Sequence, residues 1–163
     1  MRIRPFDEAD LSALVELTVE TFRPLFEDQI RPTYGGELFD LHHGRRQQDF
    51  RDEIPTLHDP AAGRWIAVAE KPTTCRWGSS PGPSPATGRT TGGSSCSRVS
   101  RPYRRADIGR RLCEHAIEAL KAGGVEVVEL GTGGEDTFHA PARALYESLG
   151  FLKVPIAGYI RRI

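Results

Sequence analysis

The pattern of apolar and polar residues predicts helices and strands on both sides of one unusual central segment. Apolar residues recur every three or four positions in two stretches, 11–22 and 108–120, which is typical of helices with one buried face. A polar stretch over 36–54 and a shorter one over 141–149 are also predicted to be helical. This order indicates a mixed α/β fold without internal repeats. Apolar or alternating runs predict strands at 2–5, 65–69, 125–130, 151–154 and 159–163.

Residues at the predicted helix ends support these boundaries. Asp7 is placed to cap the first helix, with Asp10 three residues later. Pro24 and Pro32 are expected to bracket a break in the helical region that follows. The glycine pair at 123–124 is expected to end the helix that starts near residue 108.

The central segment 71–98 departs from this pattern. It is rich in Gly, Pro, Ser, Thr and Arg, and over 71–101 the only branched aliphatic residue is Val99. Central strands are normally apolar and β-branched, so this composition is abnormal for the middle of a sheet. One interpretation is an intrinsically disordered insertion.

A compensated frameshift is the second interpretation of this segment. When Arg76–Gly82 is decoded from the third base of each codon, and if the two serines use TC-type codons, the result is a Val/Leu-Gly-apolar-apolar-small run, which resembles a strand. Ser94–Ser97 likewise gives a mostly apolar run, and the normal frame resumes near Val99. Stop codons in the displaced frame of the gene would exclude this hypothesis.

Composition narrows the class of protein. The 163 residues carry 22 basic and 22 acidic side chains, so no overall basic charge favours nucleic acid. No apolar run approaches the roughly 18 residues of a membrane span, and the amino-terminal residues lack the apolar core of a signal peptide. Cys75, Cys96 and Cys113 lack metal-site spacing, so no metal is expected. We therefore expect a soluble, cytoplasmic protein.

Two stretches near the carboxyl end make the order of elements specific: YRRADIGRRLCEHAIEALKAGGVEVVEL (103–130) and HAPARALYESLGF (139–151). The first resembles the acetyl-CoA-binding core of the GNAT (Gcn5-related N-acetyltransferase) superfamily. The second resembles the family's next motif, a helix with Leu-Tyr that is closed by Gly-Phe. The resemblance is clear over about 101–155, fair over 1–22 and 64–70, and absent over 71–98.

This resemblance implies one α/β domain over 1–163, with a mixed, mostly antiparallel central sheet flanked by helices and an abnormal segment at 71–98. It also implies acetyl-CoA as co-substrate. The family pattern Arg/Gln-x-x-Gly-x-Gly/Ala matches at Arg104 and Gly109, and a helix N-terminus there suits a pyrophosphate. The residues expected to bind acetyl-CoA are Val99, Arg104, Arg105, Ala106, Asp107, Ile108, Gly109 and Arg110.

Asp107 departs from the family pattern, because it stands where the family has its inner glycine. Glycine takes a positive φ easily and lets the backbone approach phosphate. Asp tolerates this conformation better than most residues and is also a good N-cap. Asp107 is therefore interpreted as a plain N-cap or as a carboxylate that opposes the phosphates, and the two interpretations are compatible.

Tyr146 is the catalytic residue that the resemblance implies most directly, as the acid that protonates the departing CoA thiolate. A phenol has a pKa of about 10, above the thiol's value of about 8.5, so it donates a proton at neutral pH. The alternative is that Tyr146 only packs in the core. The amine must also lose a proton, and 71–98 contains no Asp or Glu, so Glu129, with Glu126 as a second choice, is the candidate base.

Other polar residues are given structural interpretations. His42 and His43 are expected to form a surface pair, although they lie in a region that would line the acceptor pocket. His139 is expected to be a cap or loop residue, and Gly131–Gly134 a turn.

The leading functional hypothesis is transfer of an acetyl group from acetyl-CoA to a primary amine of a small molecule or peptide. The alternative is an impaired or non-catalytic GNAT-fold relic that at most binds acyl-CoA, as Asp107 and the polar central segment suggest. A third hypothesis, two small modules joined by a disordered linker, is weaker because neither half would bury a core alone. Edge strands near the carboxyl end permit a homodimer.

Overall fold

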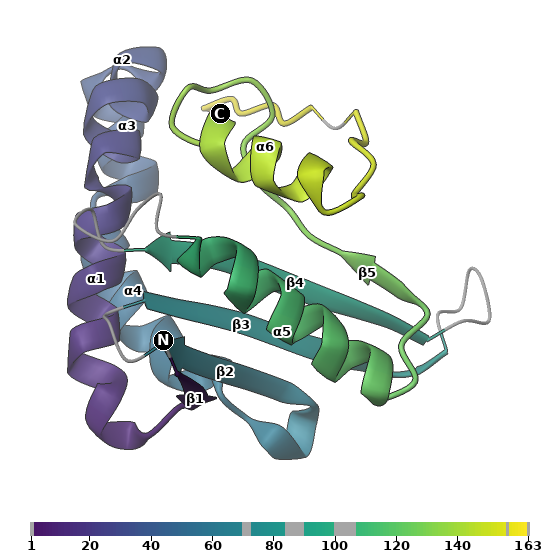
Figure 1. Ribbon diagram of the computed structural model, residues 1–163. Coiled ribbons are helices and arrows are strands. Elements are labelled where there is room, and N and C mark those ends of the chain that lie inside the picture. Colours follow the sequence, from purple (N-terminus) through teal and green to yellow (C-terminus); the bar gives the residue numbers. More distant parts are fainter. Residues whose placement is uncertain (1, 70–72, 84–89, 100–106, 156, 163) are drawn as a thin grey trace.

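A five-stranded sheet forms the centre of the computed structural model (Figure 1). The structure describes residues 2–69, 73–83, 90–99, 107–155 and 157–162, with only the backbone described at 73–83 and 90–99. The first four strands form an antiparallel meander, whereas the last pairs parallel to the fourth. In spatial order the strands are β1 (Ile3–Pro5), β2 (Arg64–Ala69), β3 (Thr73–Pro83), β4 (Thr90–Val99) and β5 (Val127–Glu129).

Helices cover both faces of this sheet. None of the described helices is long and apolar enough to cross a membrane. Short turns of other helix types join the longer elements: η1 (Glu8–Asp10), η2 (Leu25–Ile30), η3 (Ile54–Leu57) and η4 (Pro60–Ala62). The α-helices are α1 (Leu11–Pro24), α2 (Arg31–Tyr34), α3 (Gly36–His43), α4 (Arg46–Glu53), α5 (Ile108–Ala122) and α6 (Ala140–Ser148).

Strand β2 separates two hydrophobic cores, because successive side chains of a strand point to opposite faces of a sheet. Ile66 and Val68 belong to the core cluster formed with α1 and η3, which also contains Leu14 and Ile54. Ala69 belongs to the other cluster, which packs under α5. Figure 1 shows α5 lying across one face of the sheet, with α4 behind the other. The fold is therefore a three-layer arrangement, which confirms the predicted mixed, mostly antiparallel α/β architecture.

The first helix begins as predicted. Asp7 accepts a hydrogen bond from the Ala9 N–H at 2.9 Å, and the Asp10 carboxylate accepts from the Asp7 N–H at 2.9 Å, so the two form a capping box. The Arg4 guanidinium donates two 2.7 Å hydrogen bonds to Asp10. This paired contact lowers the pKa of Asp10 and ties β1 to the start of α1.

The predicted break between Pro24 and Pro32 is wrong. Pro24 is the last residue of α1, and the backbone continues helically through the wider π-turns of η2 into α2. Pro32 lies in the first turn of α2, where its missing N–H disrupts little. The interruption comes at Gly35 instead, where φ is +72°.

The disordered-insertion interpretation of 71–98 is also wrong. Most of that segment forms β3 and β4, which pair with each other over most of their length. β3 also pairs with β2 in a register that runs from Arg64 opposite Gly78 to Ala69 opposite Thr73. Backbone pairing does not depend on apolar side chains, so a Gly- and Ser-rich segment still completes the sheet. The frameshift hypothesis concerns the gene and remains a prediction.

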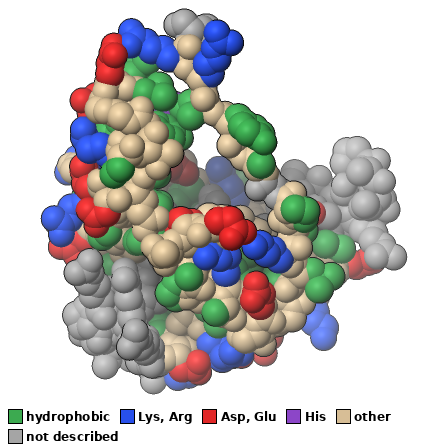
Figure 2. Space-filling model, turned by 90° about the horizontal axis from the view of Figure 1, so that it is seen from above, with side chains coloured by type: hydrophobic (Ala, Val, Ile, Leu, Met, Phe, Trp, Pro, Cys, Tyr) green, Lys and Arg blue, Asp and Glu red, His purple; other side chains and the backbone are tan. Residues whose placement is uncertain are grey.

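The strands predicted at 151–154 and 159–163 do not form in the described part of the carboxyl end. β5 is only three residues long and offers little edge on which another strand would pair. The carboxyl segment instead runs back over α6 (Figure 1), with Leu152 90% and Tyr159 96% exposed. Ion pairs of Lys153 with Glu135 and of Arg162 with Glu37 hold it. This face of the molecule is hollowed beside that segment (Figure 2).

Substitution of Leu112 on α5 tests the hydrophobic core between this helix and the sheet. The Leu112 side chain is only 1% exposed, so Leu112→Ala should lower the free energy of unfolding by about 2–5 kcal/mol through lost burial and a residual cavity. Urea denaturation would measure this change. Leu152→Ala, at a position that is 90% exposed, is the matched control and should stay within about 0.5 kcal/mol. Equal effects of the two substitutions would contradict the assigned core.

Candidate active site

The two parallel strands of the sheet separate along their length and open a fork. β4 and β5 pair only from Thr91 opposite Val127 to Gly93 opposite Glu129. β4 then continues to Val99, whereas β5 ends at Glu129 and a glycine-rich loop follows. Ligands of open α/β sheets bind where the carboxyl ends of neighbouring strands diverge in this way. We call the region beyond Gly93 and Glu129 the strand fork.

The residue that precedes helix α5 has a backbone conformation that glycine adopts readily. Asp107 precedes the helix with φ +58° and ψ +9°, and its carbonyl accepts the Arg111 N–H at 3.1 Å. Among the described residues it is the only one other than glycine with a positive φ. Asp107 thus has the backbone conformation that glycine adopts readily, and Asp is one of the residues that tolerate this region.

Asp107 occupies the N-cap position of α5, as one interpretation expected, but its side chain does not cap the helix. Its side chain makes no capping hydrogen bond to the first turn of α5 and is 65% exposed. The carboxylate Oδ1 lies 3.5 Å from Nε of Arg110 instead. The N–H groups of the first helical turn are therefore not blocked by Asp107, and they are suited to an anion. The residues present fit a diphosphate at this helix end.

The other residues expected to bind acetyl-CoA lie at the start of α5, at the end of β4, or outside the described residues. Ile108, the first residue of α5, is buried, and Gly109 is half-buried beside it, so both shape the start of the helix. Val99 ends β4, on the arm of the fork that extends past β5. Arg104–Ala106 lie outside the described residues, so their expected role stays a prediction.

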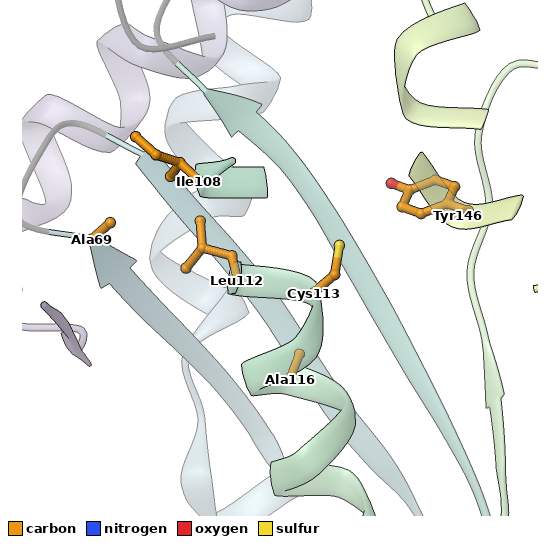
Figure 3. Packing of buried hydrophobic residues seen from close by; sticks show 6 residues of the cluster. All are labelled: Ala69, Ile108, Leu112, Cys113, Ala116 and Tyr146. Atoms are coloured by element: carbon orange, nitrogen blue, oxygen red, sulfur yellow. The ribbon is translucent and has the colours of Figure 1, made fainter. Parts of the chain in front are cut away.

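Tyr146 points from α6 toward α5. Its side chain is 5% exposed and belongs to the same buried cluster as Cys113, which it faces in Figure 3. The ring also contacts Phe151 edge-on, with the two centroids 6.0 Å apart. Burial raises the pKa of Tyr146 to about 12, with a smaller contribution from the charge that a Cys113 thiolate would carry. The phenol therefore keeps its proton throughout the physiological range.

Cys113 is a packing residue rather than a nucleophile. The thiol is 3% exposed, and its burial raises its pKa to about 11, with a further increase from Glu114 and an opposing effect of Arg110. Reactive cysteines need a thiolate, which this environment disfavours. The Tyr146 phenol therefore lies close to a thiol that stays neutral.

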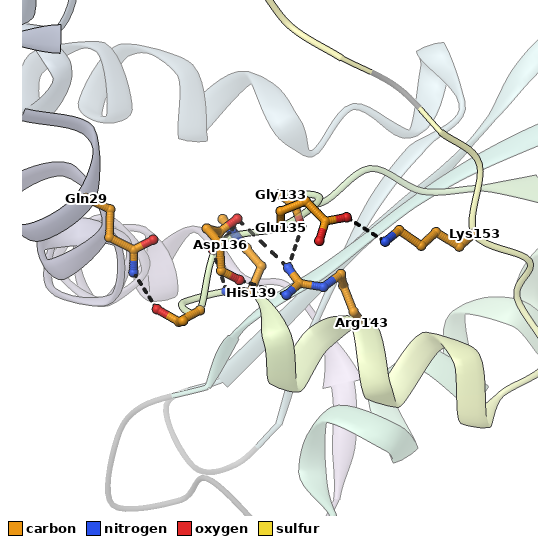
Figure 4. Close-up of polar contacts among 8 residues, drawn as sticks. Gln29, Gly133, Glu135, Asp136, His139, Arg143 and Lys153 are labelled. Carbon is orange, nitrogen blue, oxygen red and sulfur yellow. Dashed lines mark hydrogen bonds and ion pairs between the residues drawn. The ribbon is translucent and has the colours of Figure 1, made fainter. Parts of the chain in front are cut away.

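The loop between β5 and α6 contains a polar cluster that the sequence analysis did not detect (Figure 4). Nδ1 of His139 lies 2.8 and 2.9 Å from the two carboxylate oxygens of Asp136, and the His139 N–H donates to Asp136 at 2.7 Å. Arg143 donates to the carbonyls of Gly133 and Asp136 at 2.7 and 2.8 Å. His139 occupies the N-cap position of α6, as expected, but its side chain caps no helical N–H.

This cluster fixes the start of the helix that carries Tyr146. Burial alone would raise the pKa of Asp136, but hydrogen bonds from the His139 ring and backbone outweigh it and lower that pKa. The same loop contacts the amino-terminal helices, because the Phe138 ring lies 5.9 Å from that of Phe22. A Gln29 amide also donates to Thr137 at 3.3 Å. The loop therefore connects the start of α6 to α1 and η2.

Glu129 and the two histidines lie outside the Tyr146 cluster. Glu129 is exposed at the end of β5, at the base of the strand fork. His42 is exposed as predicted, whereas His43 is half-buried and contacts Phe26 and Phe39. Burial lowers the pKa of His43, and positive charge at His42 and Arg46 lowers it further. The surface-pair prediction thus holds for His42 only.

Comparisons with known proteins agree with this geometry. The model of the acetyltransferase (GNAT) family matches residues 19–151, so the chain belongs to the GNAT acetyltransferase family. The co-substrate of this family is acetyl-CoA. A search of curated protein sequences found no significant match.

Solved structures share the fold over nearly the whole chain. A GCN5-related N-acetyltransferase from Ralstonia eutropha JMP134 is 19% identical, with a TM-score of 0.66 over 99% of this chain and 97% of that one. A predicted acetyltransferase from Clostridium acetobutylicum, solved with acetyl-CoA, is 15% identical with a TM-score of 0.65, covering 98% and 95% of the two chains. The ribosomal-protein-alanine N-acetyltransferase of Brucella melitensis biovar Abortus 2308 is 13% identical, with a TM-score of 0.63 over 100% of both chains.

A substitution at Gly133 tests the polar cluster at the start of α6. A Cβ at this position would overlap the Asp136 carboxylate and the His139 ring, so Gly133→Ala should lower the free energy of unfolding by about 1–3 kcal/mol. Gly134→Ala is the matched control, because a Cβ there meets no atom within 4 Å. Thermal and urea unfolding would compare the two variants. If the two variants are equally stable, the contact between Asp136 and His139 does not require the open space that glycine leaves at position 133.

Proposed function

We propose that this chain transfers the acetyl group of acetyl-CoA to a primary amine, within a single domain over 1–163, and that Tyr146 is the general acid. The observation that carries this proposal is the buried, protonated phenol of Tyr146 on the helix that follows the strand fork. A proton donor assists the reaction because it neutralises the negative charge that develops on sulfur as CoA departs. A phenol whose pKa is raised by burial remains a donor at every pH at which the amine reacts.

The acetyl-CoA site is proposed at the N-terminus of α5 and along the strand fork. The positive φ of Asp107 and the uncapped first turn support a diphosphate there. Ile108, Gly109 and Arg110 follow in the same turn, and Val99 lies at the end of the longer arm of the fork. We propose that a thioester held along this fork reaches Tyr146.

The reaction requires two proton transfers on opposite sides of the thioester carbonyl. The ammonium of the acceptor first loses a proton, because only the neutral amine has a lone pair. The amine nitrogen then bonds to the carbonyl carbon, the carbon–sulfur bond breaks, and the thiolate takes the phenolic proton of Tyr146. The second proton on nitrogen returns to the phenolate through solvent. We propose Glu129, at the base of the fork, as the group that accepts the first proton.

The acceptor is proposed to be a small-molecule or peptide amine. One structural relative is named a ribosomal-protein-alanine N-acetyltransferase, so peptides with amino-terminal alanine belong in the first screen beside small amines. The screen follows CoA release with a thiol reagent in the presence of acetyl-CoA and each amine. Acetyl-CoA binding without release of CoA for any amine would favour the alternative, a non-catalytic acyl-CoA-binding module.

A specific observation favours that alternative. The carboxylate of Asp107 stands at the helix end where the diphosphate is proposed, and segment 71–98 supplies no carboxylate to the sheet. Calorimetric titration with acetyl-CoA tests whether Asp107 impairs the binding step. Measurable binding by the unaltered chain is expected of the enzyme and of the binding module alike, so CoA release then separates them, whereas binding only after Asp107→Gly supports the impaired form.

Tyr146→Phe is the direct test of the general acid. Loss of the phenolic proton should lower kcat by about 10²–10⁴-fold, while the Kd for acetyl-CoA changes by less than about threefold. Because the pKa of Tyr146 is about 12, ionisation of this phenol should not lower kcat of the unaltered chain below about pH 10. A phenylalanine variant with nearly full kcat would assign Tyr146 to packing alone.

Glu129→Gln tests the proposed base. The substitution keeps the size of the side chain and removes its proton acceptor, so kcat/KM for the amine should fall by about 10²-fold near neutral pH. The loss should shrink at high pH, where the amine is already neutral in solution. Glu118→Gln, at an exposed position on α5, is the control for a change of one charge. A pH-independent loss would contradict proton transfer by Glu129.

A further inference from the structure

Arg110 lies where the proposed diphosphate site meets helix α6. Its Nη2 donates to Ser148 Oγ at 2.7 Å, and the same hydroxyl donates to the Leu145 carbonyl at 2.6 Å. Nε lies 3.5 Å from the Asp107 carboxylate, and Nη1 lies 3.7 Å from that of Glu114. One guanidinium therefore joins the loop before α5, the first turns of α5 and the last turn of α6.

The Asp107 carboxylate is a specific obstacle to diphosphate binding in this chain. Negative charge at a helix N-terminus stabilises the helix without ligand and repels an incoming anion. Charges at helix ends change such equilibria by about two- to thirtyfold. The Asp107 side chain makes no hydrogen bond to the first turn of α5. Within the described residues its charged partner is Arg110.

We propose that Arg110 is a positioning residue that makes Asp107 compatible with acetyl-CoA. Its guanidinium neutralises the carboxylate and draws it away from the first-turn N–H groups. The hydrogen bond to Ser148 holds the guanidinium in that place, because Ser148 is itself bonded to the backbone of α6. This inference rests on the proposed function, since it requires the diphosphate of acetyl-CoA at the N-terminus of α5.

The inference makes the role of Arg110 depend on the residue at position 107. When a glycine stands there, no carboxylate needs to be neutralised, so the contribution of Arg110 to binding should largely disappear. A residue that contacted phosphate directly, or that only supported the fold, would contribute equally in both cases. A double-mutant cycle therefore separates these roles.

The test is calorimetric titration with acetyl-CoA of four proteins: the unaltered chain, Asp107→Gly, Arg110→Gln and the double variant. Arg110→Gln should raise Kd about tenfold when Asp107 is present and less than about threefold in the Asp107→Gly background. Arg110→Lys keeps the charge and should recover most of the affinity. Lys121→Gln removes one positive charge at the opposite end of α5 and should change Kd by less than about twofold.

Two outcomes overturn the inference and are distinguishable from each other. An equal rise of Kd in both backgrounds would show that Arg110 acts independently of Asp107, while acetyl-CoA binding, and with it the proposed function, would stand. No binding by either the unaltered chain or Asp107→Gly would contradict the diphosphate site itself. Far-UV circular dichroism and urea unfolding of each variant identify any that fails to fold, in which case Arg110→Met, which also removes the charge, replaces Arg110→Gln in the cycle.

Discussion

The packing of α5 against the sheet is the constraint on which the rest of the structure depends. Ile108, Leu112 and Ala116 bury the apolar face of this helix against the cluster that contains Ala69, and Cys113 faces the ring of Tyr146 (Figure 3). The same helix begins at the proposed diphosphate site. Because a rigid helix links its first turn to the residues it buries, the position of α5 against the sheet sets the distance between that site and Tyr146.

The sheet beneath α5 is held by backbone pairing in a region whose composition is unusual for a central strand. β3 and β4 use Gly, Ser, Thr and Pro where apolar, β-branched residues are common. Their hydrogen-bonded registers nevertheless place β4 next to β5, and the early end of β5 opens the strand fork. The fork therefore arises from the lengths of the strands, whereas the buried surface comes from the flanking elements β2 and α5.

Sequence motifs identified much of the candidate site, but not how its charged groups are paired. The motif around Tyr146 and the family loop ending at Gly109 were recognisable, because both depend on residues within one short stretch. The contact of Arg110 with Ser148 joins residues 38 positions apart, so no local pattern indicates it. The contact between Asp136 and His139 joins residues only three positions apart, yet it forms only because Gly133 leaves room and Arg143 holds the loop. An Asp and a His three residues apart are otherwise unremarkable.

The sequence by itself determined the elements whose signals are local. Apolar periodicity defined α1 and α5, the Asp7–Asp10 capping box marked the first helical turn, and glycines ended α5 and α6, because each signal acts within about one turn of helix. Only the tertiary structure decided that the backbone stays helical beyond Pro24. It also decided that the segment after β2 pairs as strands, whereas the described carboxyl segment forms no strand. Those outcomes depend on backbone partners and packing surfaces supplied by distant parts of the chain, and a local sequence pattern contains no information about them.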